Sequence, residues 1–162
     1  MHDNSQLLNM FYTAFEALDA ETMMECYAPD ATFEDEVFTL NGREQIADMW
    51  RMLCDATRSK GMDAWSLEFS GVESDATRGQ AHWEPRYRFS ATGRMVHNII
   101  DARFEFRDGL IVAQRDRFNF WRWSRQALGL PGLLLGWTPM LRDKVRAQAM
   151  ANLQAYRQRK AG

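Results

Sequence analysis

The sequence predicts an α+β domain in which N-terminal helices pack against a strongly bent antiparallel sheet, with an extra helix at the C-terminus. Before Ala64 the apolar residues recur at helical spacing, and from there to residue 123 their period changes to two, as in strands. Residues 124–162 return to a helical pattern. Because helices followed by consecutive antiparallel strands build one layered unit, we expect a single domain over residues 1–162, with a core at 1–123 and a C-terminal helical extension at 124–162.

Three helices are expected before the main sheet. Asp19 is predicted to cap the second helix, which Pro29-Asp30 ends because proline cannot continue the hydrogen-bond ladder. The third opens at Asn41-Gly42-Arg43-Glu44, an Asn cap with a Glu three residues later. A short strand is expected at 31–38, between these two helices. The apolar stripes are Leu7, Phe11, Ala14, Phe15 and Leu18 on the first helix, and Ile46, Met49, Trp50, Leu53 and Cys54 on the third.

The remaining elements follow the change of period. Strands are predicted near 64–73, 77–90, 94–107 and 110–123, with turn signals at 90–93 and 107–109. Ser124 is predicted to cap a short turn that closes at Gly129, and Thr138-Pro139 to begin a final helix. That helix has an apolar stripe and a basic opposite face. This pattern favours docking on the protein's own sheet or on a subunit partner over contact with a membrane.

Composition excludes several classes of function. The chain has 162 residues, 46% of them hydrophobic, and a formal net charge of −2, so it can bury a core and lacks the basic stripe of a nucleic-acid binder. No apolar run reaches the roughly 20 residues of a membrane span, and no secretory signal is visible at the start. Cys26 and Cys54 lie in helical patterns, as expected of reduced thiols in a cytoplasmic protein. The 10 Met, 10 Phe and 6 Trp suit an apolar interior.

Strand alternation assigns one apolar face, which should be the concave side of the bent sheet. It carries Trp83, Pro85, Tyr87 and Phe89 on one strand, Val96, Asn98, Ile100, Ala102, Phe104 and Phe106 on the next, and Val112, Gln114, Asp116, Phe118 and Phe120 on the last. We expect a pocket there, lined by Phe11, Trp50, Trp83, Tyr87, Asn98, Ala102, Phe104, Gln114 and Phe118.

Polar residues on this apolar face are the candidate functional groups. Asp35 shares a face with Phe33 and Val37, where burial raises a carboxyl pKa toward the range of a general base. It could equally cap a loop at the end of the strand. Asp116 is the second candidate, and an ion pair with a neighbouring Arg is its structural alternative. For Asn98 and Gln114 the alternative is a hydrogen bond to the backbone.

Other chemistries have no support in the pattern. The three histidines do not cluster as metal ligands, no Gly-rich phosphate loop follows a strand, and no His shares the concave face with a Ser or Cys. We therefore expect neither a metal nor another cofactor.

The segments FYTAFEALDAETMMECYAPDATFEDEVF and NGREQIADMW, with the later ARFEFRDGLIVAQRDRFNF, resemble nuclear transport factor 2-like proteins, the superfamily of ketosteroid isomerases and SnoaL-like polyketide cyclases. The likeness covers roughly residues 5–120. It implies a cone-shaped half-barrel with a deep pocket, and a homodimer formed through the outer sheet face.

Carried over by position, the resemblance places the isomerases' general base on Asp35. Their phenol donor falls on Phe11, with Tyr12 beside it pointing elsewhere, and their protonated acid falls on Ala102. Asp101 is one residue away, on the opposite face. The resemblance thus implies that the base is kept and the donors to the substrate oxygen are not.

Two functions follow from the sequence. The first is an enzyme that isomerises or cyclises a hydrophobic carbonyl compound, with Asp35 removing a proton while Asp116, with Asn98 or Gln114, holds the oxygen. The second is a binding or scaffolding module for a small hydrophobic molecule. Neither involves nucleic acid or a membrane.

Overall fold

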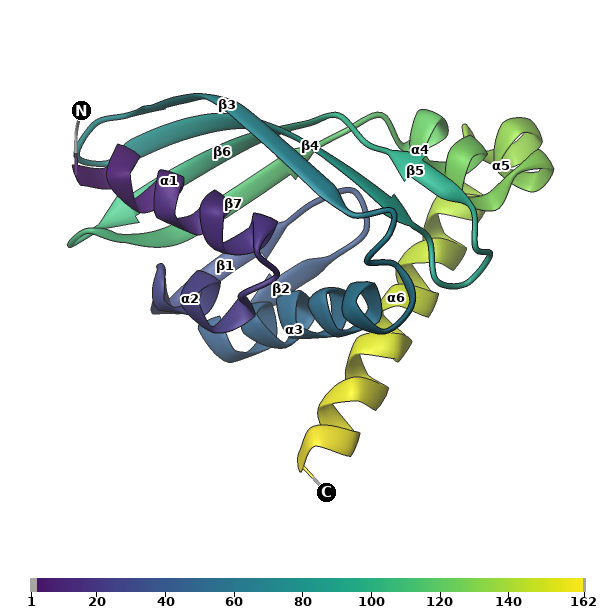
Figure 1. Ribbon diagram of the computed structural model, residues 1–162, viewed down its shortest axis with the longest axis horizontal. Coiled ribbons are helices and arrows are strands. Elements are labelled where there is room, and N and C mark those ends of the chain that lie inside the picture. Colours follow the sequence, from purple (N-terminus) through teal and green to yellow (C-terminus); the bar gives the residue numbers. More distant parts are fainter. Residues whose placement is uncertain (1–2, 162) are drawn as a thin grey trace.

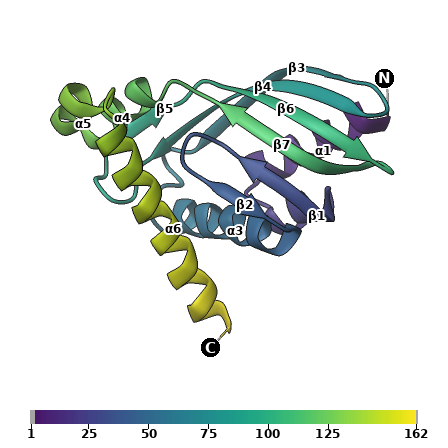
Figure 2. The same ribbon diagram turned by 180° about the vertical axis from the view of Figure 1, so that it is seen from behind.

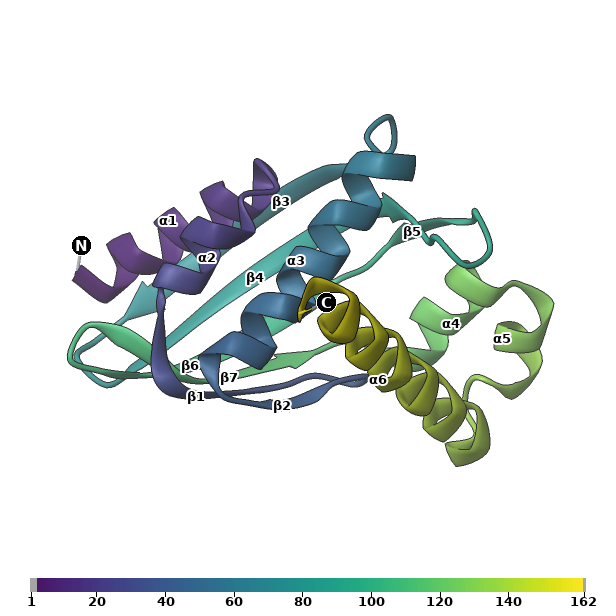
Figure 3. The ribbon, with the colours of Figure 1, turned by 90° about the horizontal axis from the view of Figure 1, so that it is seen from below.

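The computed structural model describes residues 3–161 and confirms the α+β class (Figure 1). Its strands form one sheet in the order β2-β1-β7-β6-β4-β3, with β5 paired to β4. The sheet is strongly curled and unclosed, and α1, α2 and α3 lie against one face of it (Figure 3). The elements are α1 Asp3–Glu16, α2 Ala20–Glu25, β1 Tyr27–Glu34, β2 Thr39–Asn41, α3 Arg43–Lys60, β3 Ser66–Ser74, β4 Arg78–Arg88, β5 Met95–His97, β6 Ile100–Arg107, β7 Leu110–Arg117, α4 Phe120–Leu128, α5 Leu130–Leu135 and α6 Pro139–Ala161.

The first strand departs from the predicted antiparallel pattern. β1 pairs in parallel with β7, and it begins at Tyr27 rather than at residue 31. Pro29 therefore lies inside β1, and α2 ends earlier, at Glu25. The register with β7 slips between Tyr27 and Thr32, so Pro29 sits where no regular ladder needs its missing N–H.

The helix starts are partly as predicted. The Asp19 carboxylate caps α2 by accepting the backbone N–H of Thr22 at 3.1 Å. Asn41 does not cap α3, because it is the last residue of β2, and Gly42 holds the N-cap with a φ of 92°. The side chain of Gln45 reaches back instead and accepts the N–H of Asn41 at 2.8 Å.

Two predicted strands are shorter than their hydrophobic pattern. The strand expected at 94–107 is broken into β5 and β6 around Asn98, whose N–H donates to Pro85 O at 3.0 Å. The strand expected at 110–123 ends at Arg117 because Asn119 caps α4. Ser124, the predicted cap, is buried within α4 instead.

The inner face of the sheet has the predicted composition except beside a bulge. Along β6 the alternation is regular, with Ile100, Ala102, Phe104 and Phe106 all buried. A register shift between Glu105 and Phe106 puts Ile111 on the inside and leaves Val112 half-buried, so the prediction for Val112 was wrong. The alternation is restored at Gln114 and Asp116, which both face inward.

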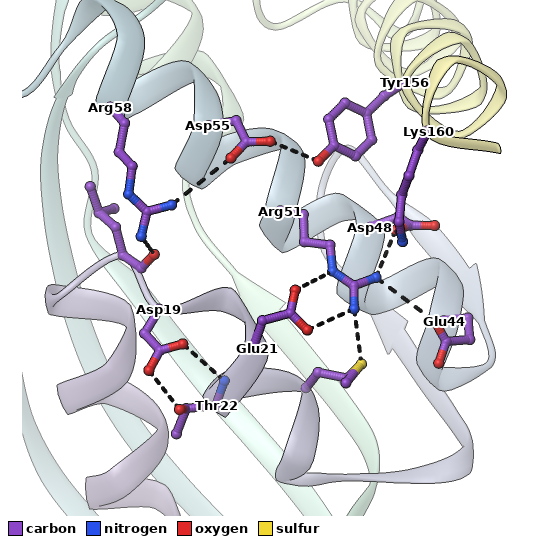
Figure 4. Close-up of polar contacts among 12 residues, drawn as sticks. Asp19, Glu21, Thr22, Glu44, Asp48, Arg51, Asp55, Arg58, Tyr156 and Lys160 are labelled. Carbon is purple, nitrogen blue, oxygen red and sulfur yellow. Dashed lines mark hydrogen bonds and ion pairs between the residues drawn. The ribbon is translucent and has the colours of Figure 1, made fainter. Parts of the chain in front are cut away.

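The C-terminal helix docks on α3 rather than on the sheet (Figure 2). Leu153 is fully buried, and the buried carboxylate of Asp48 on α3 receives three cations. Two of them, Arg51 and Lys160, are seen beside Asp48 in Figure 4. Arg51 Nη1 lies at 2.8 Å, Lys160 Nζ at 2.7 Å and Arg157 Nε at 3.0 Å. The basic face of α6 is therefore occupied at this end by ion pairs within the chain.

Candidate functional site

The predicted pocket residues lie on the inner side of the cone. Most are buried, whereas Tyr87, Phe118 and Asp35 keep partial exposure. Phe11 and Trp50 meet edge to face with ring centroids 6.1 Å apart, and Phe104 joins the same apolar core. Phe118 packs against this core from its edge.

This interior is filled by side chains. Tyr12 stacks on Phe69 at 5.3 Å between centroids, and Phe15 lies 5.4 Å from Trp83. Two hollows in the described part of the chain lie outside the cone. One, of about 430 Å³, is an open groove beside α1 and α2, and the other, of about 200 Å³, is the polar recess between α2, α3 and α6 (Figure 4). Neither is lined by a residue predicted for the pocket.

A chain of buried hydrogen bonds ends at Asp116. Trp50 Nε1 donates to Tyr27 Oη at 3.1 Å, and the Tyr27 hydroxyl donates to Gln114 Oε1. Gln114 Nε2 then donates to Asp116 Oδ1 at 3.1 Å. An indole N–H can only donate, so it fixes the direction of every later bond. Gln114 thus bonds side chains rather than the backbone, and no Arg among residues 3–161 pairs with Asp116.

Burial makes the carboxyl of Asp116 a weak acid. Desolvation raises the pKa of Asp116 to about 8, and the nearby charge of Asp35 adds to the rise, while the Gln114 hydrogen bond opposes it. Asp116 is therefore protonated at neutral pH. Since Oδ1 accepts from Gln114, the proton belongs on Oδ2, which has no hydrogen-bond partner in the described structure.

Two further buried donors without partners surround this carboxyl. Trp83 Nε1 and the Tyr12 hydroxyl both lack a hydrogen bond, and their rings lie 6.0 Å apart. The indole N–H of Trp83 lies close enough to oppose the rise in the pKa of Asp116, although the pair does not reach hydrogen-bond geometry. Burial first, and the charge of Asp116 second, raise the pKa of Tyr12. Three unpaired polar groups, the Tyr12–Trp83–Asp116 cluster, therefore face one region of the interior.

Sheet register explains how this cluster is assembled. Asp116 lies directly across from Ala102, and Ala102 lies across from Ala81 on β4. Trp83 is two residues beyond Ala81 and so points to the same face. Two small residues thus leave room above the sheet that Tyr12 fills from α1. Tyr12 was expected to point away, but it is fully buried.

Asp35 serves as a turn residue and keeps acid–base capacity. It follows the end of β1, and its Oδ1 accepts the N–H groups of Val37 at 2.7 Å and Phe38 at 2.6 Å. The loop-capping alternative is therefore part of its role. Burial of the carboxyl raises the pKa of Asp35 to about 6, against the lowering effect of the Phe38 and Val37 hydrogen bonds. Its Oδ2 takes no hydrogen bond within the described residues.

The helix α4 closes the wide end of the cone near Asp35. Trp123 Nε1 donates to Tyr87 Oη at 2.8 Å, and Phe120 packs beside Trp123. Val37 and Phe118 contact both the main core and the cluster under α4. The helix α4 thus covers this end of the sheet. Asn98 stands apart from Asp116, with its Oδ1 accepting the N–H of Ile99.

Comparison with known proteins agrees with this architecture. The model of the SnoaL-like domain family matches residues 8–114. A structure of an LEH-like epoxide hydrolase from M. tuberculosis is 18% identical, covers 82% of this chain and 96% of its own, and has a TM-score of 0.63.

Two other solved structures have the same fold. A candidate polyketide cyclase from Silicibacter sp. is 22% identical, with 76% and 94% coverage and a TM-score of 0.61. A Catenulispora acidiphila protein with a ketosteroid isomerase-like fold, in complex with trimethylamine, is 16% identical, with 82% and 97% coverage and a TM-score of 0.62. No curated protein matches the chain. At these identities the structures establish the nuclear transport factor 2-like fold alone.

Proposed function

We propose that this chain, which belongs to the SnoaL-like domain family, is a cofactor-free enzyme that isomerises or cyclises a hydrophobic carbonyl compound. The Tyr12–Trp83–Asp116 cluster would hold the substrate oxygen, and Asp35 would move a proton at the carbon beside the carbonyl. The convergence of three buried polar atoms without partners carries the proposal. Such atoms are costly unless a further group completes their hydrogen bonds.

The two carboxyl groups have environments suited to different roles. With a pKa of about 6, Asp35 is ionised at neutral pH and can accept a proton. With a pKa of about 8, Asp116 is protonated and can donate a hydrogen bond from Oδ2. Pairs of titratable groups whose pKa values are pushed apart by their surroundings divide acid and base roles in this way. Hydrogen bonds aimed at the oxygen would stabilise the enolate charge as it develops.

The donors that the resemblance implies are lost would be supplied from adjacent positions. The phenol position fell on Phe11, and the next residue, Tyr12, is the one that faces Trp83. The acid position fell on Ala102, and Asp116 is its direct cross-strand neighbour. Gln114 does not need to touch the substrate, because its role would be to keep the Asp116 proton on Oδ2.

A second candidate is a non-catalytic binding or scaffolding module. The packed interior favours it, since neither the groove beside α1 and α2 nor the recess between α2, α3 and α6 reaches Asp116. For catalysis, side chains at the wide end, such as Phe118 and Trp123, must move to admit a substrate.

The two candidates separate in a proton-exchange experiment. The protein is incubated in D2O with a panel of enolisable hydrophobic ketones, and deuterium at the α-carbon is read by NMR. We expect exchange in the wild type and a loss of about 10²–10⁴-fold in Asp35→Asn, as for a general base. Tyr12→Phe should lower the rate while keeping the ring packing, and Asp101→Asn, on the outer face, should not. Ketones that bind, as seen by ligand NMR, without any exchange would identify the binding module instead.

A further inference from the structure

An exposed apolar surface lies at the end of the molecule that carries α5, away from the N-terminal end of α1 (Figures 1 and 2). Trp137 is 74% exposed, Met140 68% and Leu130 65%. We call this surface the end patch, and it consists of Leu130, Leu133, Leu134, Leu135, Trp137 and Met140. Scattered exposed apolar residues are ordinary in proteins, but six exposed ones within eleven positions are a concentration of the kind that marks an interaction site.

The end patch projects on a short element that the fold does not need. The main packing partner of α5 is α4, which leaves its outer side without cover. Gly132 allows this close approach, because a Cβ there would lie 1.9 Å from Ser124 O. The leucines thus lie on a helix that is packed closely against α4, and Trp137 follows directly after that helix.

Positive charge surrounds the end patch. Residues 119–146 contain five basic residues and one acidic residue, in a chain whose net charge is −2. The Arg94 guanidinium lies 3.1 Å from the position a Cβ on Gly129 would take, directly before α5. Arg125 stacks on Trp121 at 4.5 Å, and Lys144 is exposed on the first turns of α6. Within residues 3–161, none of Arg94, Arg125 and Lys144 forms an ion pair with a carboxylate.

We propose that the end patch docks on an anionic lipid surface. The leucines and the tryptophan could enter the acyl region of a bilayer, and the basic groups without carboxylate partners could contact its anionic headgroups. A second copy fits less well, because a symmetric contact would bring two basic rims together. No helix of the described chain is long and apolar enough to cross a membrane, so the contact would be peripheral.

The proposal differs from the membrane contact considered for the last helix. The basic groups near the end of α6, Arg157 and Lys160, bond to Asp48 and are not available to lipid. It also departs from the expectation, drawn from the sequence, that no membrane is involved. It stands independently of the proposed chemistry, because it uses no residue of the Tyr12–Trp83–Asp116 cluster.

Vesicle co-sedimentation tests the proposal. The wild-type protein should sediment with phosphatidylcholine vesicles that contain phosphatidylserine, and much less with phosphatidylcholine alone. The double variant Leu134→Glu/Trp137→Glu should bind at least about tenfold more weakly, since burying one large apolar side chain is worth about that factor. Arg125→Glu/Lys144→Glu should weaken binding and its dependence on salt. Met62→Glu, which changes an apolar residue with 56% exposure on the turn after α3, is the matched control and should bind normally.

Three results would overturn the proposal. The first is failure of the wild type to bind anionic vesicles. The second is equal binding by the end-patch variant when circular dichroism shows that it is folded. The third is a wild type that ignores vesicles and self-associates in light scattering while the end-patch variant does not, which would assign the surface to a second copy of the chain.

Discussion

Replacing Asp116 by Asn should stabilise the protein, and the gain should grow with pH. A buried carboxyl with a pKa of about 8 holds a proton that the unfolded chain releases at a pKa of about 3.9. Between these two values the folded state binds more protons than the unfolded state, so its stability falls as pH rises. Asparagine removes this linkage. Its Oδ1 can still accept from Gln114, and its Nδ2 places a donor where Asp116 carries its proton.

The size of the effect follows from the two pKa values. At pH 7 the solution lies about three units above the unfolded-state pKa, and each unit is worth about 1.36 kcal/mol. The stability of Asp116→Asn over the wild type should therefore rise from near zero around pH 4 to about 4 kcal/mol at pH 7, and level off above pH 8. The difference between the two proteins isolates Asp116, because groups that do not interact with Asp116 titrate alike in both.

Urea denaturation followed by tryptophan fluorescence at pH 4.5, 6, 7 and 8 measures this difference. Asp143→Asn, which removes a carboxylate at an exposed position on α6, is the matched control for the loss of one negative charge. A difference that stays flat with pH would refute the reasoning, because it would mean that Asp116 titrates alike in the folded and unfolded states. Destabilisation that increases with pH would show an ionised and paired Asp116.

Three further outcomes are expected. Asp48→Ala should cost about 2–3 kcal/mol in urea denaturation, less than a fully buried ion pair because Arg157 and Lys160 keep 40% and 46% exposure. Burial raises the pKa of Asp48, but the bonds from Lys160 and Arg51 outweigh burial and leave the pKa lowered. The contribution of Asp48 should therefore be lost as the pH falls below the unfolded-state pKa of about 3.9. Gly132→Ala should cost about 1–3 kcal/mol and expose α5 to limited proteolysis, because its Cβ would overlap Ser124 O. The outer sheet face, with His97, Ile99, Arg103 and Arg115, should form a homodimer seen in light scattering, and Ile99→Asp should shift the protein toward monomer.

Most of the fold could be predicted because helices and strands differ in the spacing at which their apolar residues recur. Alternation along β6 placed Ala102 and Phe104 inside, since consecutive strand residues point to opposite faces. The predicted strand faces and bounds are wrong where an extra residue or a break interrupts the alternation along a strand. The bulge between Ile111 and Ala113 reverses the predicted faces of Ile111 and Val112, and the break at Asn98 separates β5 from β6. No side chain at these positions indicates the irregularity in the sequence.

Cap positions were predictable in kind and not always in place. The segment after β7 contains both Asn119 and Ser124, which are both good N-cap residues. Asn119 is used because the Arg122 N–H lies 3.0 Å from its side chain, and Phe120 is then buried as the first residue of α4. At α3 the sequence offered Asn41, but pairing with β1 keeps Asn41 in β2. In both cases tertiary packing decided between local signals of similar strength.

The candidate site was predictable for its carboxyl groups and not for their partners. A carboxylate on an apolar strand face is visible in the sequence, and so Asp35 and Asp116 were both found. Tyr12 was not among the predicted site residues. The sequence does carry a helical signal for its burial, since Leu8, Tyr12 and Phe15 share one buried stripe at spacings of four and three. The proximity of Tyr12 and Asp116 depends on sheet register and helix rotation together, and single-sequence periodicity fixes neither. Position-by-position comparison has the same restriction. It tested Phe11 and Ala102, whereas side chains from a neighbouring helix position and a neighbouring strand can fill the same volume. Chemistry in a cone-shaped fold is therefore better compared by the space that polar atoms occupy than by the residue numbers that supply them.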